Sequence, residues 1–181
     1  MENKVIPSQA LCALRRVQSA VPQAVIAGGC IRDYILKRPI HDIDIFVPDD
    51  DFLAAEHAII EAHPAIGGTR DKLPCANIVK ARYYKGEVWP INLIAVHNCT
   101  PETIFQHFDF GFCRVAFDGK YLWKDVKFDI DARSETITLY SAATAERHAR
   151  ALKRYEYFTE KYVGKYVGWR FIDATRLTRE R

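Results

Sequence analysis

Two short stretches decide the fold: GGCIRD at residues 28–33 and HDIDIFV at residues 41–47. The first follows a short apolar run and precedes a helical pattern, which predicts a strand, a turn and a helix. A Gly-Gly pair in such a turn lets the backbone approach a ligand closely. The N–H groups that begin the helix attract phosphate. The second stretch alternates polar and apolar residues, which predicts a strand with Asp42 and Asp44 on one face.

Asp42 and Asp44 are the candidate metal ligands. Two carboxylates on one face of a strand repel each other, and a divalent cation between them removes that cost. Mg²⁺ takes one or two carboxylates and completes its shell with water and substrate phosphates. The alternative is a solvent-facing edge with two hydrophilic residues, which an isolated pair would favour. The nearby Gly28 and Gly29 shift the interpretation toward a site for Mg²⁺ or Mn²⁺ and a phosphate.

The rest of the chain predicts an α+β domain, a mixed sheet flanked by helices with a C-terminal helical extension. Apolar spacing predicts helices over residues 8–21, 31–36, 52–63, 101–107 and 144–162. Residues 77–84 with 87–96, and 110–117 with 120–123, predict two hairpins. Residues 136–139 predict a short strand. We expect a head domain over residues 1–140 and a basic helical extension over residues 141–181.

Composition narrows the class of protein. The 181 residues are 49% hydrophobic and 27% charged, so the chain buries a core. The net charge of +3 permits a phosphate-bearing ligand without requiring nucleic acid. The five cysteines have no CxxC spacing, which argues against a disulfide framework or a zinc site. No signal peptide or membrane-length apolar run is present, so we expect a soluble, cytoplasmic protein without a membrane partner.

The quoted residues resemble a known pattern. GGCIRD, the basic-proline turn Lys37-Arg38-Pro39 and then DID are similar to the head of the polymerase β nucleotidyltransferase superfamily. The similarity is to the class II tRNA CCA-adding enzymes and bacterial poly(A) polymerases, in a minimal single-domain form. FDFGFCRVAFD at residues 108–118 resembles the RDFTINALAYD motif of that branch. The basic helix from Arg147 resembles its RxLRxxRF helix. The nucleotidyltransferase fold is therefore expected.

The resemblance implies roles for particular residues. Asp42 and Asp44 would be the catalytic, metal-binding carboxylates. The nucleotide-binding candidates are Gly28, Gly29, Arg32, Asp33, Asp109 and Arg114. Arg32 pairs either with a phosphate or with Asp33, and the sequence leaves both open. One helix face carries the candidate contacts to RNA or phosphate, which are Arg147, Arg150 and Arg154.

The chain departs from the superfamily pattern at Asn92. Most members place a third carboxylate on a later strand, and here the matching position in residues 89–96 is asparagine. Asparagine can ligate a metal through its carbonyl but cannot accept a proton as a base. Three interpretations stay open. Asn92 is a weak ligand, or Glu87 or Asp109 substitutes for the third acid, or the acceptor reaction is impaired.

The sequence thus predicts an enzyme, a metal-dependent nucleotidyltransferase. It would transfer a nucleotide from an NTP to a hydroxyl acceptor, with an RNA or tRNA 3′ end favoured. One alternative is a toxin-like transferase that modifies tRNA or protein. Another is a degenerate nucleotide-binding module that regulates a partner, which Asn92 favours. Because the body domains of CCA-adding enzymes have no counterpart here, a homo-oligomer or partner protein is a further expectation.

Overall fold

The computed structural model describes residues 6–62, 78–85, 88–142, 144–161 and 165–175. It divides into two compact units. The first comprises residues 1–107 and 115–123, and the second comprises residues 108–114 and 124–181.

The first unit is built on a six-stranded mixed sheet of order β3-β4-β2-β1-β5-β6. Strand β2 pairs in parallel with β4, whereas β1 pairs antiparallel with both β2 and β5, and β3 pairs antiparallel with β4. The strands are β1 Val25–Ala27, β2 Ile43–Pro48, β3 Ile78–Tyr84, β4 Ile91–Val96, β5 Val115–Phe117 and β6 Leu122–Lys124.

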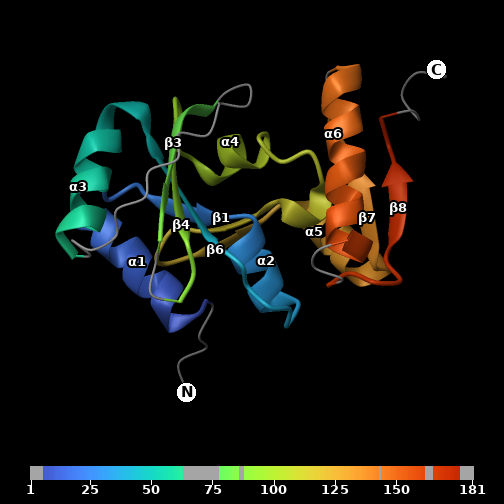
Figure 1. Ribbon diagram of the computed structural model, residues 1–181, viewed down its shortest axis with the longest axis horizontal. Helices are drawn as coiled ribbons and strands as arrows, with labels where there is room; N and C mark the ends of the chain where they lie inside the picture. Colours follow the sequence, from blue (N-terminus) through green and yellow to red (C-terminus); the bar gives the residue numbers. More distant parts are fainter. Residues whose placement is uncertain (1–5, 63–77, 86–87, 143, 162–164, 176–181) are drawn as a thin grey trace. The chain divides into compact units, whose positions relative to one another are not determined.

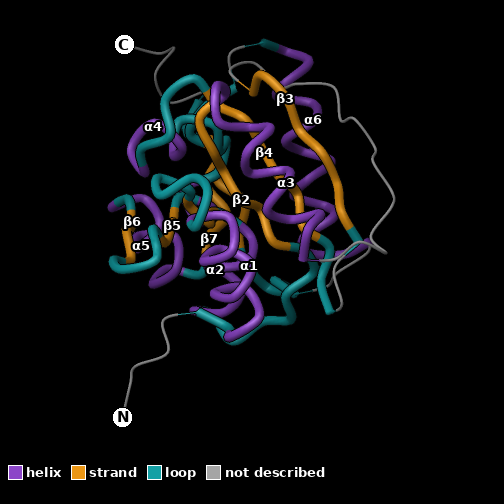
Figure 2. Tube along the Cα trace, turned by 90° about the vertical axis from the view of Figure 1, so that its left-hand side faces the viewer, coloured by secondary structure: helices purple, strands orange, loops and turns teal. Residues whose placement is uncertain are grey.

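Helices cover both faces of this sheet. Figure 1 shows α1 and α3 together on one side of β3 and β4, with α2 on the other side, and Figure 2 looks onto the side that carries α1 and α3. The helices are α1 Ser8–Gln18, α2 Gly29–Ile35, α3 Phe52–Ala62 and α4 Pro101–Phe105, with a 3₁₀ turn at Asp49–Asp51. Helix α4 begins in a capping box formed by Thr100 and Thr103.

Alternation along β2 divides its side chains between the two faces. Ile43, Ile45 and Val47 are at most 2% exposed and point to one face, as the period of two requires. Asp44 lies on the opposite face and is only partly buried. Burial of the apolar set sets the register of β2, because a slip of one residue would bury the carboxylate instead.

A buried polar contact ties the edge strand β3 to helix α3. The Tyr84 hydroxyl donates to a carboxylate oxygen of Glu56 at 2.8 Å, and Arg82 also pairs with Glu56. Glu56 is 4% exposed and Tyr84 is 1% exposed. Buried polar groups of this kind are costly unless paired, so the contact holds β3 in position against α3.

The second unit packs two parallel strands with two helices. Strand β7 Thr136–Leu139 pairs with β8 Arg170–Asp173. The helices are α5 Val126–Ser134 and α6 Ala145–Glu156, and α6 continues as a wider π-helical turn over Tyr157–Lys161. Helix α6 packs on β8 through the rings of Tyr155 and Phe171, whose centroids are 4.9 Å apart.

Asp131 connects the parts of the second unit. Its fully buried carboxylate accepts hydrogen bonds from the backbone N–H groups of Phe112 and Thr138 and from the hydroxyls of Thr136 and Thr138. Phe112 lies in a 3₁₀ turn at Gly111–Cys113. The carboxylate therefore joins that turn, helix α5 and strand β7.

The observed fold confirms the expected α+β class, a mixed sheet flanked by helices. The sequence predicts a boundary at residue 140, whereas contacts group residues 108–114 and 124–140 with the C-terminal residues. Asp131 is the physical reason, because its hydrogen bonds join these segments. The C-terminal region also contains β8, which the sequence does not predict.

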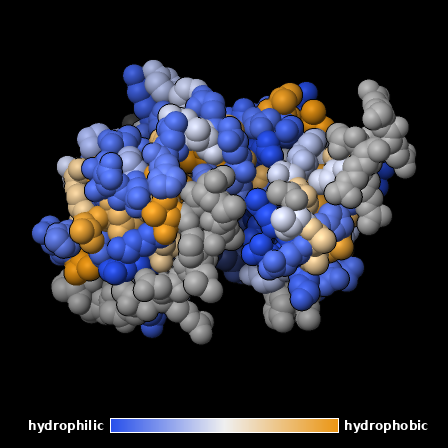
Figure 3. All heavy atoms as spheres, turned by 90° about the horizontal axis from the view of Figure 1, so that it is seen from above, coloured by the Kyte–Doolittle hydropathy of each residue, from blue (hydrophilic) through white to orange (hydrophobic). Residues whose placement is uncertain are grey.

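No helix among the described residues is long and apolar enough to cross a membrane. Figure 3 shows one face of the molecule, on which hydrophilic residues predominate and apolar residues form small, separate patches. Scattered apolar residues of this kind are normal on a protein surface.

Candidate active site

The candidate site is a row of polar side chains on one face of the first sheet. In the parallel pair of β2 and β4, Asp44 lies directly opposite Asn92. The Asn92 amide Nδ2 donates to Asp44 Oδ1 at 2.8 Å and to Asp42 Oδ2 at 3.2 Å. Asn92 is 4% exposed, whereas the two aspartates are partly buried. The three residues therefore meet at one point, as their shared face predicts.

The glycine pair lies beside these carboxylates. Gly28 precedes α2 and has a φ of 75° and a ψ of −126°, a left-handed conformation that glycine adopts without strain. Its N–H donates to the Val115 carbonyl at 2.8 Å, which fixes the turn on β5. A Cβ added to Gly29 would lie 3.8 Å from Asp42 Oδ1 and 3.7 Å from a terminal nitrogen of Arg32. The glycine backbone is thus exposed to the same space as the carboxylate.

Arg32 and Asp33 form a buried ion pair at the start of α2. Arg32 Nε donates to Asp33 Oδ1 at 2.7 Å, and the residues are 4% and 2% exposed. Of the two roles left open for Arg32, the structure contains the pairing with Asp33. A contact of either residue with nucleotide stays a prediction.

The pKa of Cys30 reflects first its burial and then the carboxylates around it. Burial, followed by the charges of Asp44, Asp33 and Asp42, raises the pKa of its thiol to about 12. The thiol is 1% exposed and stays protonated at neutral pH, since the thiolate would lie among carboxylates. Cys30 is therefore neither a nucleophile nor a thiolate ligand at neutral pH.

Burial and the neighbouring carboxylates together predict selective thiol chemistry. At pH 8 iodoacetamide should modify Cys30 at least about 100-fold more slowly than an ordinary exposed thiol, because the thiolate is the reactive form. Cys12 is exposed on α1 and serves as the internal reference. Peptide mass spectrometry of a time course measures both. Equal rates at the two cysteines would contradict the burial of the Cys30 thiol beside these carboxylates.

The carboxylate pair fits a divalent cation bound with phosphate. Asp42 and Asp44 provide oxygen ligands, and Mg²⁺ is commonly held by one or two carboxylates together with substrate phosphates. Among the described residues, no group of three or more His, Cys, Asp or Glu side chains converges on one point. A cation held by this pair would take the remainder of its coordination shell from water and ligand.

Tyr83 joins this row and is not predicted by the sequence. In the antiparallel pair of β3 and β4, Tyr83 lies opposite Asn92, so the two side chains share a face with Asp44. Tyr83 is half-buried, on an edge strand. A turn at residues 85–86 would place Tyr83 opposite Val88, so the predicted hairpin does not give this register. The observed pairing of β3 with β4, and of β4 with β2, places Tyr83 in the same row as Asp44.

Asp109, Arg114 and the arginines of α6 lie in the second unit. Asp109 pairs with Arg147 at 3.1 Å and with Arg154 at 3.9 Å. Arg114 is 8% exposed and donates to Asp125 and to the Phe108 carbonyl. These charges are thus held by partners within their own unit.

The alternatives for a third acid remain predictions. Asp109 is held by two arginines of its own unit, and Glu87 lies outside the described residues. Arg150 is exposed on α6. The roles assigned to Arg114 and to the α6 arginines in binding nucleotide or RNA remain predictions as well.

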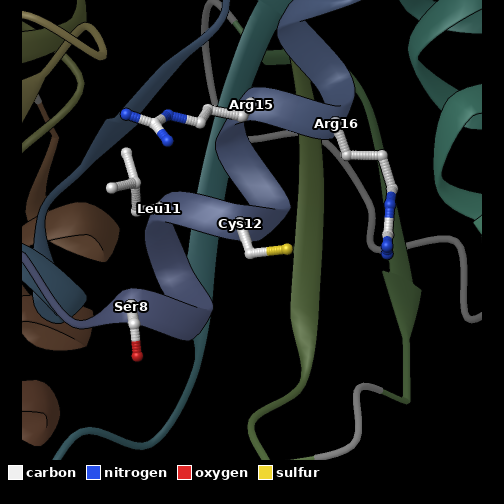
Figure 4. Close-up of a pocket in the computed structure, with 5 residues that line it drawn as sticks. All are labelled: Ser8, Leu11, Cys12, Arg15 and Arg16. Atoms are coloured by element: carbon white, nitrogen blue, oxygen red, sulfur yellow. The ribbon is translucent and has the colours of Figure 1, made fainter.

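A separate hollow lies on helix α1, and none of the residues that line it belongs to the polar row of Asp42, Asp44 and Asn92. Its lining residues all belong to that helix and are Ser8, Leu11, Cys12, Arg15 and Arg16. Figure 4 shows Arg15 and Arg16 leaving the helix in opposite directions. The side chains do not converge on a common point, so the hollow has no polar cluster to match that of Asp42, Asp44 and Asn92.

Comparison with family models gives one match over most of the chain. Residues 6–132 match the model described as Gad2, Gabija anti-defense 2 family protein. Shorter similarities join the chain to curated CCA-adding enzymes. The enzyme of Lactobacillus delbrueckii subsp. bulgaricus is 47% identical over 38 residues, which are 21% of this chain and 10% of that enzyme. The enzyme of Staphylococcus epidermidis is 49% identical over 37 residues, which are 20% of this chain and 9% of that enzyme.

Solved structures share the fold. The Thermotoga maritima CCA-adding enzyme complexed with tRNA superposes with a TM-score of 0.69 at 16% identity, covering 96% of this chain and 42% of that enzyme. The Bacillus stearothermophilus CCA-adding enzyme in complex with CTP superposes with a TM-score of 0.58 at 16% identity. The match covers 94% of this chain and 41% of that enzyme. The chain thus has the fold of less than half of each enzyme. At this identity the similarity establishes the nucleotidyltransferase fold of CCA-adding enzymes.

Proposed function

The chain belongs to the Gabija anti-defense 2 family, and from that premise we propose that it is a metal-dependent nucleotidyltransferase. It transfers a nucleotide from an NTP to a hydroxyl acceptor, with an RNA or tRNA 3′ end favoured. The observation that carries the proposal is the convergence of Asp42, Asp44 and Asn92 beside the Gly28-Gly29 turn. The matched structures include one with tRNA and one with CTP, which supports this substrate class.

Asp42 and Asp44 would hold the divalent cation together with the phosphates of the NTP. When bound, Mg²⁺ or Mn²⁺ supplies charge neutralisation at the triphosphate. Gly29 leaves room for a phosphate next to the carboxylates, since a Cβ at this position would contact Asp42 and Arg32. The oxygen of the acceptor hydroxyl attacks the α-phosphorus of the NTP. The bond between the α-phosphorus and the α–β bridging oxygen breaks, pyrophosphate leaves, and the hydroxyl proton passes to solvent.

The family name adds a biological setting. According to this name, members of the family act against a defence called Gabija. We extend this action to the present chain, in the cytoplasm of the cell in which that defence operates. Nucleotide transfer would then modify an RNA or a protein on which the defence depends. A protein therefore remains an alternative acceptor.

A second candidate function is nucleotide binding without turnover. The neutral Asn92 at the third-carboxylate position favours it, because within the described part of the chain no further carboxylate joins the pair to help activate an acceptor. A bound nucleotide would in that case regulate a partner protein or a second copy of the chain.

One assay separates these functions. The protein is incubated with Mg²⁺ or Mn²⁺, each labelled NTP in turn, and either total RNA or an extract of candidate proteins. Label on RNA is the expected result, and label on protein alone would refute the RNA acceptor. Absence of incorporation, with NTP binding intact by equilibrium dialysis, would support the second candidate.

The arginines of α6 predict how RNA binds. Arg150 is exposed, so Arg150→Ala should weaken RNA binding a few-fold and reduce the salt dependence by about one phosphate contact. Arg147 pairs with Asp109, and Arg147→Ala should instead lower the melting temperature. Fluorescence anisotropy at several salt concentrations measures the first effect. Unchanged affinity in Arg150→Ala would remove α6 from the RNA interface.

A further inference from the structure

Asn92 occupies the centre of the site and determines its charge. It is 4% exposed and lies opposite Asp44 in the parallel register. Its Nδ2 donates to one oxygen of each carboxylate, at 2.8 Å for Asp44 and 3.2 Å for Asp42. An amide between two anionic oxygens must present its N–H groups, because Oδ1 in that place would repel both.

Because the amide of Asn92 is neutral, the anionic ligands that this row offers are the carboxylates of Asp42 and Asp44. Two carboxylates balance the charge of a single divalent cation. A second cation nearby would be repelled by the first, and closely spaced cation pairs need further anionic ligands to offset that repulsion. Among the described residues, no third acidic, histidine or cysteine side chain joins the pair.

We propose that Asn92 limits this site to one divalent cation, the one bound together with the phosphates of an NTP. The inference rests on the proposed function for the identity of the ligand. The amide holds Asp42 and Asp44 together in the absence of cation and contributes no charge when the cation binds. An aspartate at this position would allow a second cation to bind.

The test counts cations on the folded, full-length chain. Mn²⁺ is titrated into equimolar protein and α,β-methylene ATP or α,β-methylene CTP, whose α–β linkage is not cleaved, and bound Mn²⁺ is measured by electron paramagnetic resonance. We expect one bound Mn²⁺ per complex in the wild type and two in Asn92→Asp. A wild-type count of two or of zero would overturn the proposal, as would a count of one in Asn92→Asp.

Two further variants separate charge from packing. Asn92→Ala removes the amide without adding charge and should retain a count of one, and a count of two would show that the amide itself excludes the second cation. Asn98→Asp makes the same chemical change at an exposed position just after β4, and should also give one. If Asn92→Asp does not fold by circular dichroism, the wild-type count still decides.

The count and the proposed function fail in distinguishable ways. A wild type that binds one Mn²⁺ with nucleotide but transfers no label supports the inference and refutes turnover. A wild type that transfers label while binding two cations retains the proposed function and refutes the inference. If Asn92→Asp gains a cation, its transfer to RNA should also rise relative to wild type.

Discussion

Replacing Asp42 and Asp44 together by asparagine is expected to abolish nucleotide transfer while raising the melting temperature. Loss of both negative charges removes the proposed ligands of the cation, so transfer should fall to below about one thousandth of the wild-type rate. Both carboxylates accept from the single amide of Asn92, which places two like charges close together. Relief of their repulsion should stabilise the fold by about 1 kcal/mol.

A matched control lies at the end of the same strand. Asp49 and Asp50 begin the 3₁₀ turn that follows β2, and their double replacement by asparagine should leave transfer unchanged. It should lower stability slightly, because acidic residues favour the start of a helix. Transfer is measured with labelled NTP and stability by thermal denaturation without metal. Transfer that persists in the Asp42 and Asp44 variant would refute the site, and a lowered melting temperature would refute a repulsive pair.

The carboxylate pair could be predicted from sequence because its evidence is local. Alternation over residues 41–47 assigns Asp42 and Asp44 to one face without knowledge of any partner strand. The glycine turn is local in the same sense. The contact of the pair with Asn92 depends on β2 and β4 pairing in parallel. The register of two strands joined by a long crossover cannot be predicted from the residues of either strand alone.

The second unit shows why other elements were not predicted. The sequence predicts a strand over residues 110–117 because they precede a turn at Asp118-Gly119. Gly111–Cys113 instead form a 3₁₀ turn, in which the Phe112 N–H donates to Asp131. Helix α5 carries few buried residues, namely Phe128 and Asp131, so it has little apolar periodicity. Strand β8 pairs with β7, a partner distant in sequence.

Asp131→Ala should destabilise the second unit by about 3 kcal/mol or more. The fully buried carboxylate accepts from two backbone N–H groups and two hydroxyls. Each buried donor left without a partner costs about 1–3 kcal/mol, with partial relief where a hydroxyl can turn elsewhere. Hydrogen exchange should show lost protection at the Phe112 and Thr138 amides. Retained protection there would contradict the role of this carboxylate.

Asp129 provides the control on the same helix. Its carboxylate is 36% exposed and pairs with Lys124 at 3.0 Å. Exposed ion pairs contribute little, so Asp129→Ala should change stability by less than about 1 kcal/mol. A loss as large as that of Asp131→Ala would mean that helix α5, rather than the buried carboxylate, determines the stability of this unit.

Asp131→Asn tests the same carboxylate through pH. Burial raises the pKa of Asp131, although its hydrogen bonds with Thr138, Thr136 and the Phe112 N–H act in the opposite direction. The folded state therefore holds this proton more tightly than the unfolded state, and the stability from Asp131 falls as pH rises from the unfolded pKa through the folded one. The asparagine variant has no such titration. The difference in unfolding free energy, wild type minus Asp131→Asn, should accordingly decrease over that range in urea denaturation at a series of pH values. Other carboxylates titrate alike in both proteins and cancel, so a difference that rises with pH would show that the folded state stabilises the ionised carboxylate.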